Sequence, residues 1–529
     1  MLLLLLGCEW FICPTDAFPL NDDWSYTYSV NRFNDTGIID IGYWPAMNLV
    51  GHILWGSLFT KLFGFSHFIL RCSTLFLSTL TLLLFYRQVV NSSKNHTTAF
   101  FVTLFVFFNP IWFLLSNTFM TDVPFLFSII LSFFCVQKIV VQKKNLYIIP
   151  FTLVCVYSIL IRQFGIALSA SLLIASAINA IKDKRNSTQL LVDTIPFLVS
   201  IITYMVFEKW IAQRLLPYAA YQSTDVVTKN SMDLFMSIGD NMLRRYSSCM
   251  LYIGLFLCPL CIIAAIAFLK KKPFKHKLAT IFLMALLLFF AVNRIAVFPI
   301  GNIVYNAGLG VESLYDITIL NINTYHASSD AFLFVIKLIA ILGLMGLVII
   351  LGFGMLHFVI MVFKKVPVNK GKLFLVIFSI LYFLLLCISK SFFDRYSLPL
   401  IATVLLLMAP YIQLNAVKSG ILVLFLLGSG SFSVLSTSDY FNWNRARWSL
   451  INNTIKSGVD PFEINGGFEY TASVFYHKSW WDLWVGDKSP YKVTFGNIPN
   501  HTLVNYTTYR RYIPFKTDTV FLYRNNNNH

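Results

Sequence analysis

Two adjacent carboxylates, Asp22 and Asp23, follow the first apolar stretch of the chain, within the polar and aromatic segment 18–26. Acidic residues are scarce in this protein, with 24 Asp and Glu against 41 Lys and Arg in 529 residues. An acidic pair at the edge of a hydrophobic bundle is costly to place there, and such residues commonly handle protons or cations. The pair is therefore the first candidate for chemistry. The alternative is that Asp23 only accepts hydrogen bonds from backbone amides in a loop.

Other polar side chains lie at the ends of apolar runs that we place on the same side of the membrane as the acidic pair. They are Arg71; Asp122; Arg162 with Gln163; and Asp394, Arg395 and Tyr396. Each has a structural alternative. Asp122 is suited to cap the helix that follows it. Arg162 and Arg395 are suited to anchor helix ends, and Asp394 and Arg395 to pair with each other.

Acids and arginines gathered on one face suit a group-transfer reaction. A carboxylate can take the proton from an acceptor hydroxyl as that hydroxyl attacks. Arginines can hold a phosphate through paired hydrogen bonds and stabilise the charge that builds on it as it leaves. A lipid phosphate is already an adequate leaving group, so this chemistry needs no strong general acid.

The composition indicates a membrane protein, because 57% of the chain is hydrophobic and only 12% is charged. Apolar runs of about 18 to 25 residues, the length of a membrane-spanning helix, recur along the chain. We predict an all-α polytopic membrane protein with about thirteen spans. The first run is too short to cross a bilayer of about 30 Å, so we expect the true start to lie upstream, or this helix to be tilted or partial. The predicted spans are 1–13, 68–88, 99–116, 123–141, 146–162, 165–181, 190–210, 248–269, 279–298, 330–362, 373–389, 398–416 and 419–437.

The net charge of +17 does not indicate nucleic-acid binding, because of where the basic residues fall. They concentrate in short segments between apolar runs, and cytoplasmic loops are enriched in Lys and Arg in this way. The segments are 87–94, 138–144, 182–185, 270–277, 364–372 and Lys418. With these inside, the acidic pair and the tail lie outside.

The predicted organisation is a transmembrane domain over 1–437 and a C-terminal extracytoplasmic domain over 438–529. The first outside loop, 14–67, holds an amphipathic helix at about 45–64, which begins at Pro45 and stops at Gly64. The tail is more polar and has short alternating runs, so we expect a small mixed α/β domain.

No cofactor is indicated by the sequence. The nine His are scattered without metal-ligand spacing, and no glycine-rich nucleotide loop is present. A divalent metal stays an open alternative with no residue pattern in its support. Cys258 and Cys261 have redox-motif spacing but lie inside a predicted span, where we interpret them as apolar packing residues.

Several motifs, taken in order, resemble the family 39-type membrane glycosyltransferases of the C-type superfamily, which include protein mannosyltransferases and the aminoarabinose transferases of lipid A. The bacterial members are the most similar. The motifs are Asp22 to Tyr26, Phe119 to Phe125, Arg162 to Gly165 and Asp394 to Pro399, with Asn444 to Trp448 and Asn465 to Glu469 in the tail.

The resemblance implies an integral protein of the bacterial inner membrane with a site that faces the periplasm. It implies a polyprenyl-phosphate sugar as donor and a lipid, glycan or protein as acceptor. Asp22 or Asp23 maps onto the general base of an inverting transfer, and Asp122 onto a second acid. Contacts to the donor or its phosphate map onto Arg162 and Arg395, and we expect Arg71, Gln163 and Tyr396, which lie on the same face, to contribute to donor binding.

Two other functions stay open. An oligosaccharide polymerase or ligase also uses outer-face arginines, but its large loop usually comes late in the chain. A lipid or solute transporter needs polar or broken helices at mid-membrane depth. The residues do not identify the sugar, the acceptor or the oligomeric state, nor which of Asp22 and Asp23 is the general base.

Overall fold

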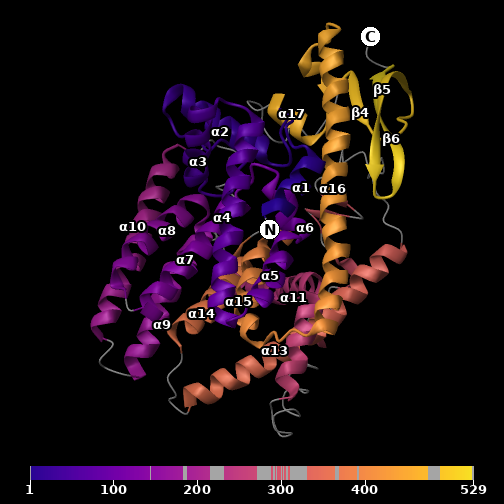
Figure 1. Ribbon diagram of the computed structural model, residues 1–529. Helices are drawn as coiled ribbons and strands as arrows, with labels where there is room; N and C mark the ends of the chain where they lie inside the picture. Colours follow the sequence, from indigo (N-terminus) through magenta and orange to yellow (C-terminus); the bar gives the residue numbers. More distant parts are fainter. Residues whose placement is uncertain are drawn as a thin grey trace.

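A computed structural model of the chain describes most of its residues, and everything below concerns those residues alone. They are 2–142, 144–182, 187–214, 231–270, 288–289, 292, 295–299, 301, 303–305, 308–309, 330–363, 369–389, 392–474 and 489–526. Over these ranges the chain is mainly helical, with a small sheet near its C-terminus (Figure 1). The predicted fold class is confirmed.

Among the described residues, eight helices are long and apolar enough to cross a membrane, or nine if one bent pair counts as a span. The prediction of about thirteen included short runs, and most of the run at 279–298 lies outside the described residues. The eight helices are α4 (His67–Ser93), α7 (Asp122–Gln142), α9 (Ile166–Lys182), α10 (Ser187–Ala212), α11 (Ser231–Lys270), α13 (Asp330–Phe363), α14 (Lys370–Ile388) and α16 (Ala416–Lys456).

Two predicted spans are broken by proline. The run 99–116 forms α5 (His96–Phe107) and α6 (Pro110–Ser116), which meet at 68°. Asn109 caps α6 by accepting hydrogen bonds from the amides of the next turn, and Pro110 occupies its first position. The run 398–416 forms only α15 (Leu398–Met408), because Pro410 lacks the N–H that would continue the helix.

The shorter helices lie around these spans. They are α1 (Leu2–Ile12), α8 (Ile148–Ile161) and the 3-10 turns η1 (Asn145–Tyr147), η2 (Gln163–Gly165), η6 (Ile295–Val297), η7 (Asp394–Ser397), η8 (Ala409–Tyr411) and η9 (Pro461–Glu463). A two-stranded ribbon of β1 (Val304–Tyr305) and β2 (Gly308–Leu309) lies between α11 and α13 in sequence.

The first loop contains two helices, α2 (Asp23–Thr36) and α3 (Val50–Phe63). The amphipathic helix predicted at 45–64 is α3, and its predicted start was wrong. The helix begins at Val50 rather than Pro45 because Leu49 has a left-handed φ of 57°, which interrupts the helical path. The helix α2 was not predicted, because its residues are mainly polar and aromatic and lack the helical repeat of apolar residues.

The C-terminal segment begins within α16, which continues past the predicted boundary at 437 to Lys456. It then forms β3 (Ile464–Asn465), α17 (Phe468–Val474), β4 (Tyr491–Thr494), β5 (His501–Tyr512) and β6 (Phe515–Asn525). The strand order is β3-β4-β6-β5, parallel between β3 and β4 and otherwise antiparallel.

One core of buried apolar side chains extends from α1 through the helices to this sheet. Asp439 of α16 fixes the turn between β5 and β6, since its carboxylate accepts the amides of Tyr512 and Ile513 at 2.6 and 2.9 Å. Figure 1 shows α16 running along the bundle to the sheet, with α2, α3 and α17 at that same end.

Candidate active site

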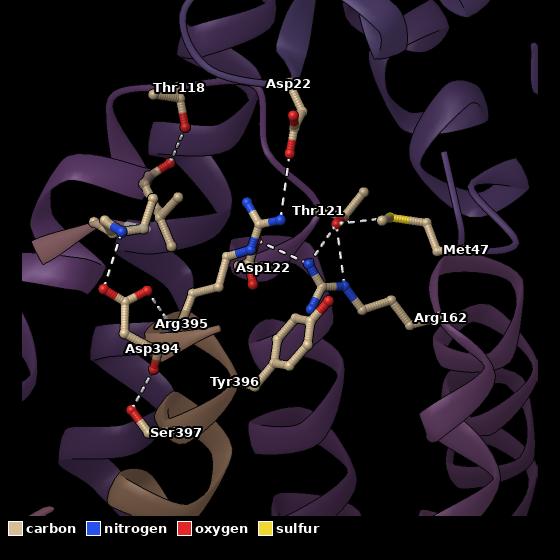
Figure 2. Close-up of polar contacts among 12 residues, drawn as sticks. Asp22, Met47, Thr118, Thr121, Asp122, Arg162, Asp394, Arg395, Tyr396 and Ser397 are labelled. Atoms are coloured by element: carbon tan, nitrogen blue, oxygen red, sulfur yellow. Dashed lines mark hydrogen bonds and ion pairs between the residues drawn. The ribbon is translucent and has the colours of Figure 1, made fainter. Parts of the chain in front are cut away.

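Four charged side chains from separate parts of the chain meet at this end of the bundle (Figure 2). Asp22 directly precedes α2, and Asp122 is the first residue of α7. Arg162 lies between α8 and η2, and Arg395 lies within η7. We call these four residues the charged cluster.

The charged cluster is held by ion pairs. Arg162 Nη2 lies 2.9 Å from Asp122 Oδ2, and Arg395 Nη2 lies 3.3 Å from Asp22 Oδ2. Arg395 Nε also lies 4.0 Å from Asp122 Oδ2, so Asp122 stands between the two guanidinium groups. The side chain of Asp22 is 13% exposed, and the other three are 5% exposed or less. Buried charges are tolerated when they are paired in this way.

The guanidinium of Arg395 has N–H groups that are able to bind a further acceptor. Its Nε and Nη1 atoms are buried and have no hydrogen-bond partner among the residues that the structure describes. Burial lowers the pKa of Arg395, but the carboxylates of Asp122 and Asp22 raise it by more, so the group stays cationic. Each unsatisfied buried donor costs about 1–3 kcal/mol. An anion that accepted these two N–H groups would remove that cost.

Arg162 is fixed more completely. Its Nε and Nη2 atoms donate to the hydroxyl of Thr121 at 3.1 and 2.7 Å. Its guanidinium also lies over the ring of Tyr396, 5.4 Å from the ring centre. Thr121 was not among the predicted site residues, although it lies inside the motif at 119–125. Tyr396 lies beside the charged cluster, and its ring supports Arg162 (Figure 2).

The two acidic neighbours have different surroundings. Both carboxylate oxygens of Asp23 accept backbone amides, from Leu20 at 2.6 Å and from Phe119 at 3.3 Å. Burial raises the pKa of Asp23 to about 7. Asp22 instead accepts the indole N–H of Trp44 at 3.0 Å and directs its other oxygen to Arg395. Asp22 therefore faces the arginines, and Asp23 joins the start of α2 to the segment before α7.

Asp122 is not a helix cap in the structure. It is the first residue of the helix itself, and its carboxylate forms the ion pairs described above, with no capping hydrogen bond seen among the described residues. Asp394 and Arg395 do not pair through their side chains either. Asp394 accepts the backbone amides of Ile303, Val304 and Arg395 at 2.7–2.9 Å, and burial raises its pKa to about 7.

Two predicted donor contacts use their polar atoms elsewhere. Arg71 donates to three backbone carbonyls of the segment 14–18, including that of Asp16 at 2.7 Å. Gln163 donates to the carbonyl of Ala46 at 3.1 Å. Within the described residues, neither side chain forms a hydrogen bond or ion pair with the charged cluster. Both therefore act on the loops around it.

Another buried ion pair, outside the charged cluster, adjoins the acidic pair. Glu469 of α17 lies 2.7 Å from Arg447 of α16, and both side chains are at most 1% exposed. Glu469 also accepts the backbone amide of Asn21 at 3.2 Å. Neither residue was among the predicted site residues, although Arg447 lies inside the motif at 444–448 and Glu469 inside the motif at 465–469.

No metal centre is apparent among the described residues, because no three His, Cys, Asp or Glu side chains are grouped as metal ligands. The polar atoms of the site are mostly guanidinium donors, which bind anions rather than cations.

Residues 42–212 match the family model described as dolichyl-phosphate-mannose-protein mannosyltransferase. The predicted family resemblance is confirmed. The match to this glycosyltransferase family covers the chain from α3 to α10 and therefore includes Asp122 and Arg162 of the charged cluster. No curated protein matches the chain.

Solved structures of ArnT from Cupriavidus metallidurans are similar in outline. The form bound to undecaprenyl phosphate has 12% identity and a TM-score of 0.42, over 90% of this chain and 68% of that one. The apo form has 12% identity and a TM-score of 0.40, over 99% of this chain and 97% of that one. At these scores, the family match and the site geometry remain the grounds for a function.

Proposed function

We propose that the protein is an inverting glycosyltransferase that moves a sugar from a polyprenyl-phosphate donor to an acceptor hydroxyl at the outer face of the membrane. The observation that carries this proposal is the buried meeting of Asp22 with Arg162 and Arg395 at one end of an apolar helical bundle. The description of the matched family names a polyprenyl-phosphate sugar, and we extend that donor class to this chain.

In this proposal the arginines hold the donor phosphate. The unpartnered Nε and Nη1 atoms of Arg395 donate to phosphate oxygens, and Arg162 adds positive charge beside them. Charge builds on the phosphate as its bond to the sugar breaks, so cations fixed in a buried site favour the transition state. Asp122 stands between the arginines and keeps both in place. We therefore assign it a positioning role rather than the acid role inferred from the sequence.

Asp22 is the general base in this proposal. Its carboxylate takes the proton of the acceptor hydroxyl while the hydroxyl oxygen forms a bond to the anomeric carbon. The bond from that carbon to the phosphate oxygen breaks, and the lipid phosphate leaves with the electron pair. Attack opposite the leaving group inverts the anomeric centre. Asp23 is unsuited to this role because backbone amides occupy both its oxygens.

The membrane setting fits a lipid donor. Large apolar side chains remain exposed along the helices, including Leu198 at 53% and Ile202 at 60% on α10. Such faces suit lipid chains. On α16, Lys418 lies near the start of the helix, and the site lies toward its other end (Figure 1). The predicted inside location of Lys418 therefore supports a site that faces outward, toward the periplasm if the membrane is the bacterial inner membrane.

Transfer can be tested with the purified protein in lipid nanodiscs. Polyprenyl-phosphate donors carrying mannose, glucose, aminoarabinose or a pentose are incubated with a membrane extract as acceptor, and the lipid products are measured by mass spectrometry. We expect one donor to be converted to polyprenyl phosphate, and the anomeric configuration of the product to be inverted by NMR. Release of polyprenyl pyrophosphate from an oligosaccharide donor would indicate a polymerase or ligase. Movement of intact lipid across the bilayer without conversion would indicate a transporter.

A further inference from the structure

The C-terminal segment contacts the residue before Asp22 through the buried carboxylate of Glu469. Glu469 lies on α17, which is 448 residues from Asn21 in sequence, and its Oε1 accepts the Asn21 amide at 3.2 Å. The same oxygen accepts the hydroxyl of Tyr440 at 3.2 Å, and Oε2 pairs with Arg447 at 2.7 Å. Tyr440 and Arg447 both belong to α16, so the carboxylate is held on that helix, and its side chain is shielded from solvent.

Asn21 is the residue that sets the direction of the acidic pair. It has a left-handed φ of 58°, a conformation that non-glycine residues adopt rarely and Asn adopts most readily. This turn ends the extended segment and starts α2, so it decides where the next residue, Asp22, points. Fixing the Asn21 amide fixes that turn.

A second contact from α17 reaches Asp22 through an aromatic ring. Phe468 packs against Trp44 with ring centres 5.3 Å apart, and the Trp44 indole donates to Asp22 at 3.0 Å. Trp24 packs against Phe468 as well, at 6.1 Å. Neighbouring residues of α17 therefore hold both the backbone before Asp22 and the side chain that bonds to it.

We propose that Glu469, backed by Arg447, is a positioning residue that holds Asp22 in its reactive orientation, so that the C-terminal segment is a working part of the active site. The inference rests on the proposed function for the role of Asp22. The hydrogen bond between the Asn21 amide and Glu469 can be tested without any assay of activity. A displaced base loses rate steeply, since about 1 Å of misplacement can cost on the order of a hundredfold.

The test needs a variant that folds. Glu469→Ala leaves Arg447 buried and unpaired, which is strongly destabilising. The double variant Arg447→Met/Glu469→Leu replaces the ion pair by apolar side chains, a change that proteins often tolerate. Arg447→Met/Glu469→Gln keeps an oxygen for the Asn21 amide without leaving a buried unpaired charge, and it is the conservative rescue. Asp439→Ala is the matched control, because Asp439 holds the tail to α16 without touching the segment 20–23.

Two readouts are compared across these variants. Hydrogen exchange by mass spectrometry reports the amides of residues 20–28, and kinetics of sugar transfer report kcat separately from the KM for the donor. For Arg447→Met/Glu469→Leu we expect faster exchange at 20–28 and a kcat lowered roughly ten- to a hundredfold with KM within about twofold. Arg447→Met/Glu469→Gln and Asp439→Ala should match the wild type in both readouts.

The outcomes are distinguishable from failure of the proposed function. Wild-type exchange at 20–28 in Arg447→Met/Glu469→Leu would overturn the link, and faster exchange with unchanged kcat would overturn the positioning role. Loss of kcat in Asp439→Ala to the same extent would also overturn it, because the tail would then act only through general stability. A wild-type protein that converts no donor would overturn the proposed function and with it the positioning role, while exchange would still decide the link.

Discussion

At the residue scale, the neighbouring acids Asp22 and Asp23 have different surroundings, and we assign them different roles. The sequence indicated that one of the pair is functional but left Asp22 and Asp23 equivalent. Their difference depends on the turn at Asn21 and on two partners, Trp44 and Phe119, whose positions come from tertiary packing. The other charged residues were predictable because arginines and acids at the ends of apolar runs are uncommon. Thr121 was not predictable, because threonine is common at such positions. Glu469 was not predictable either, because it lies in the C-terminal segment, away from the apolar runs.

Replacement of the two acids should separate their roles. Asp22→Asn removes the proposed base and should lower kcat by roughly 10²–10⁴-fold with little change in Tm. Asp23→Asn turns an amide N–H toward one of two backbone donors, so it should lower stability by about 1–3 kcal/mol. Transfer assays and thermal unfolding in detergent measure the two effects. Asp35→Asn, on an exposed part of α2, is the control and should change neither. Full activity in Asp22→Asn would remove Asp22 from the mechanism.

The pH dependence should run in opposite directions for activity and stability. Burial raises the pKa of Asp23 from 3.8 to about 7, with Arg71 lowering it and Glu469 raising it. The ionised form accepts both amides, so activity should rise as pH increases through about 7. Between about pH 4 and 7 the folded state binds more protons than the unfolded state, so the free energy of unfolding should fall as pH rises.

Asp394 has a pKa raised to about the same value, so it contributes to the same pH window. A comparison of wild type with Asp23→Asn by chemical unfolding at several pH values isolates the part due to Asp23. An equal pH slope in the two proteins would show that Asp23 does not titrate in this range.

At the element scale, long apolar runs were enough to place the spanning helices, because burial in lipid requires about 20 apolar residues in sequence. The breaks at Pro110 and Pro410 and the start of α3 were missed, since they depend on local backbone geometry. The helix α2 was missed because its buried face is polar and aromatic and packs against the rest of the site.

Packing of α3 against the site should be sensitive at Gly56. A Cβ at this position would lie 2.5 Å from the ring of Phe119 and 3.0 Å from Leu70 and Val30. Phe119 is buried and stacks on His52 at 3.9 Å, so its ring has little room to move. Gly56→Ala should therefore lower stability by about 1–3 kcal/mol and also lower activity, because the Phe119 amide bonds to Asp23.

Thermal unfolding and transfer assays check this prediction. Gly428→Ala in α16 is the matched control, because no atom lies within 4 Å of the added Cβ, and Ala favours a helix by about 1 kcal/mol. Unfolding of Gly56→Ala at or above the wild-type temperature would contradict close packing of α3 on Phe119.

At the scale of the whole molecule, the site and the C-terminal sheet lie at one end of the bundle, and α16 connects that end to the region of Lys418. The distribution of basic residues predicts that Lys418 is inside. Alkaline phosphatase fused after His529 should therefore be active in a bacterial host, and a fusion at Lys418 should be inactive. The opposite pattern would place the site on the cytoplasmic face, where the proposed orientation fails.

The central claim is that Arg395 belongs to a site for a lipid phosphate, and its most direct test does not depend on the sugar. Native mass spectrometry measures the binding of undecaprenyl phosphate and of undecaprenol to wild type, Arg395→Gln and Arg445→Gln. Arg445 is the control because it pairs with Asp16 away from the charged cluster. We predict that wild type and Arg445→Gln bind the phosphate at least tenfold more tightly than the alcohol, and that Arg395→Gln loses this preference. Equal phosphate binding by Arg395→Gln and wild type would contradict the account.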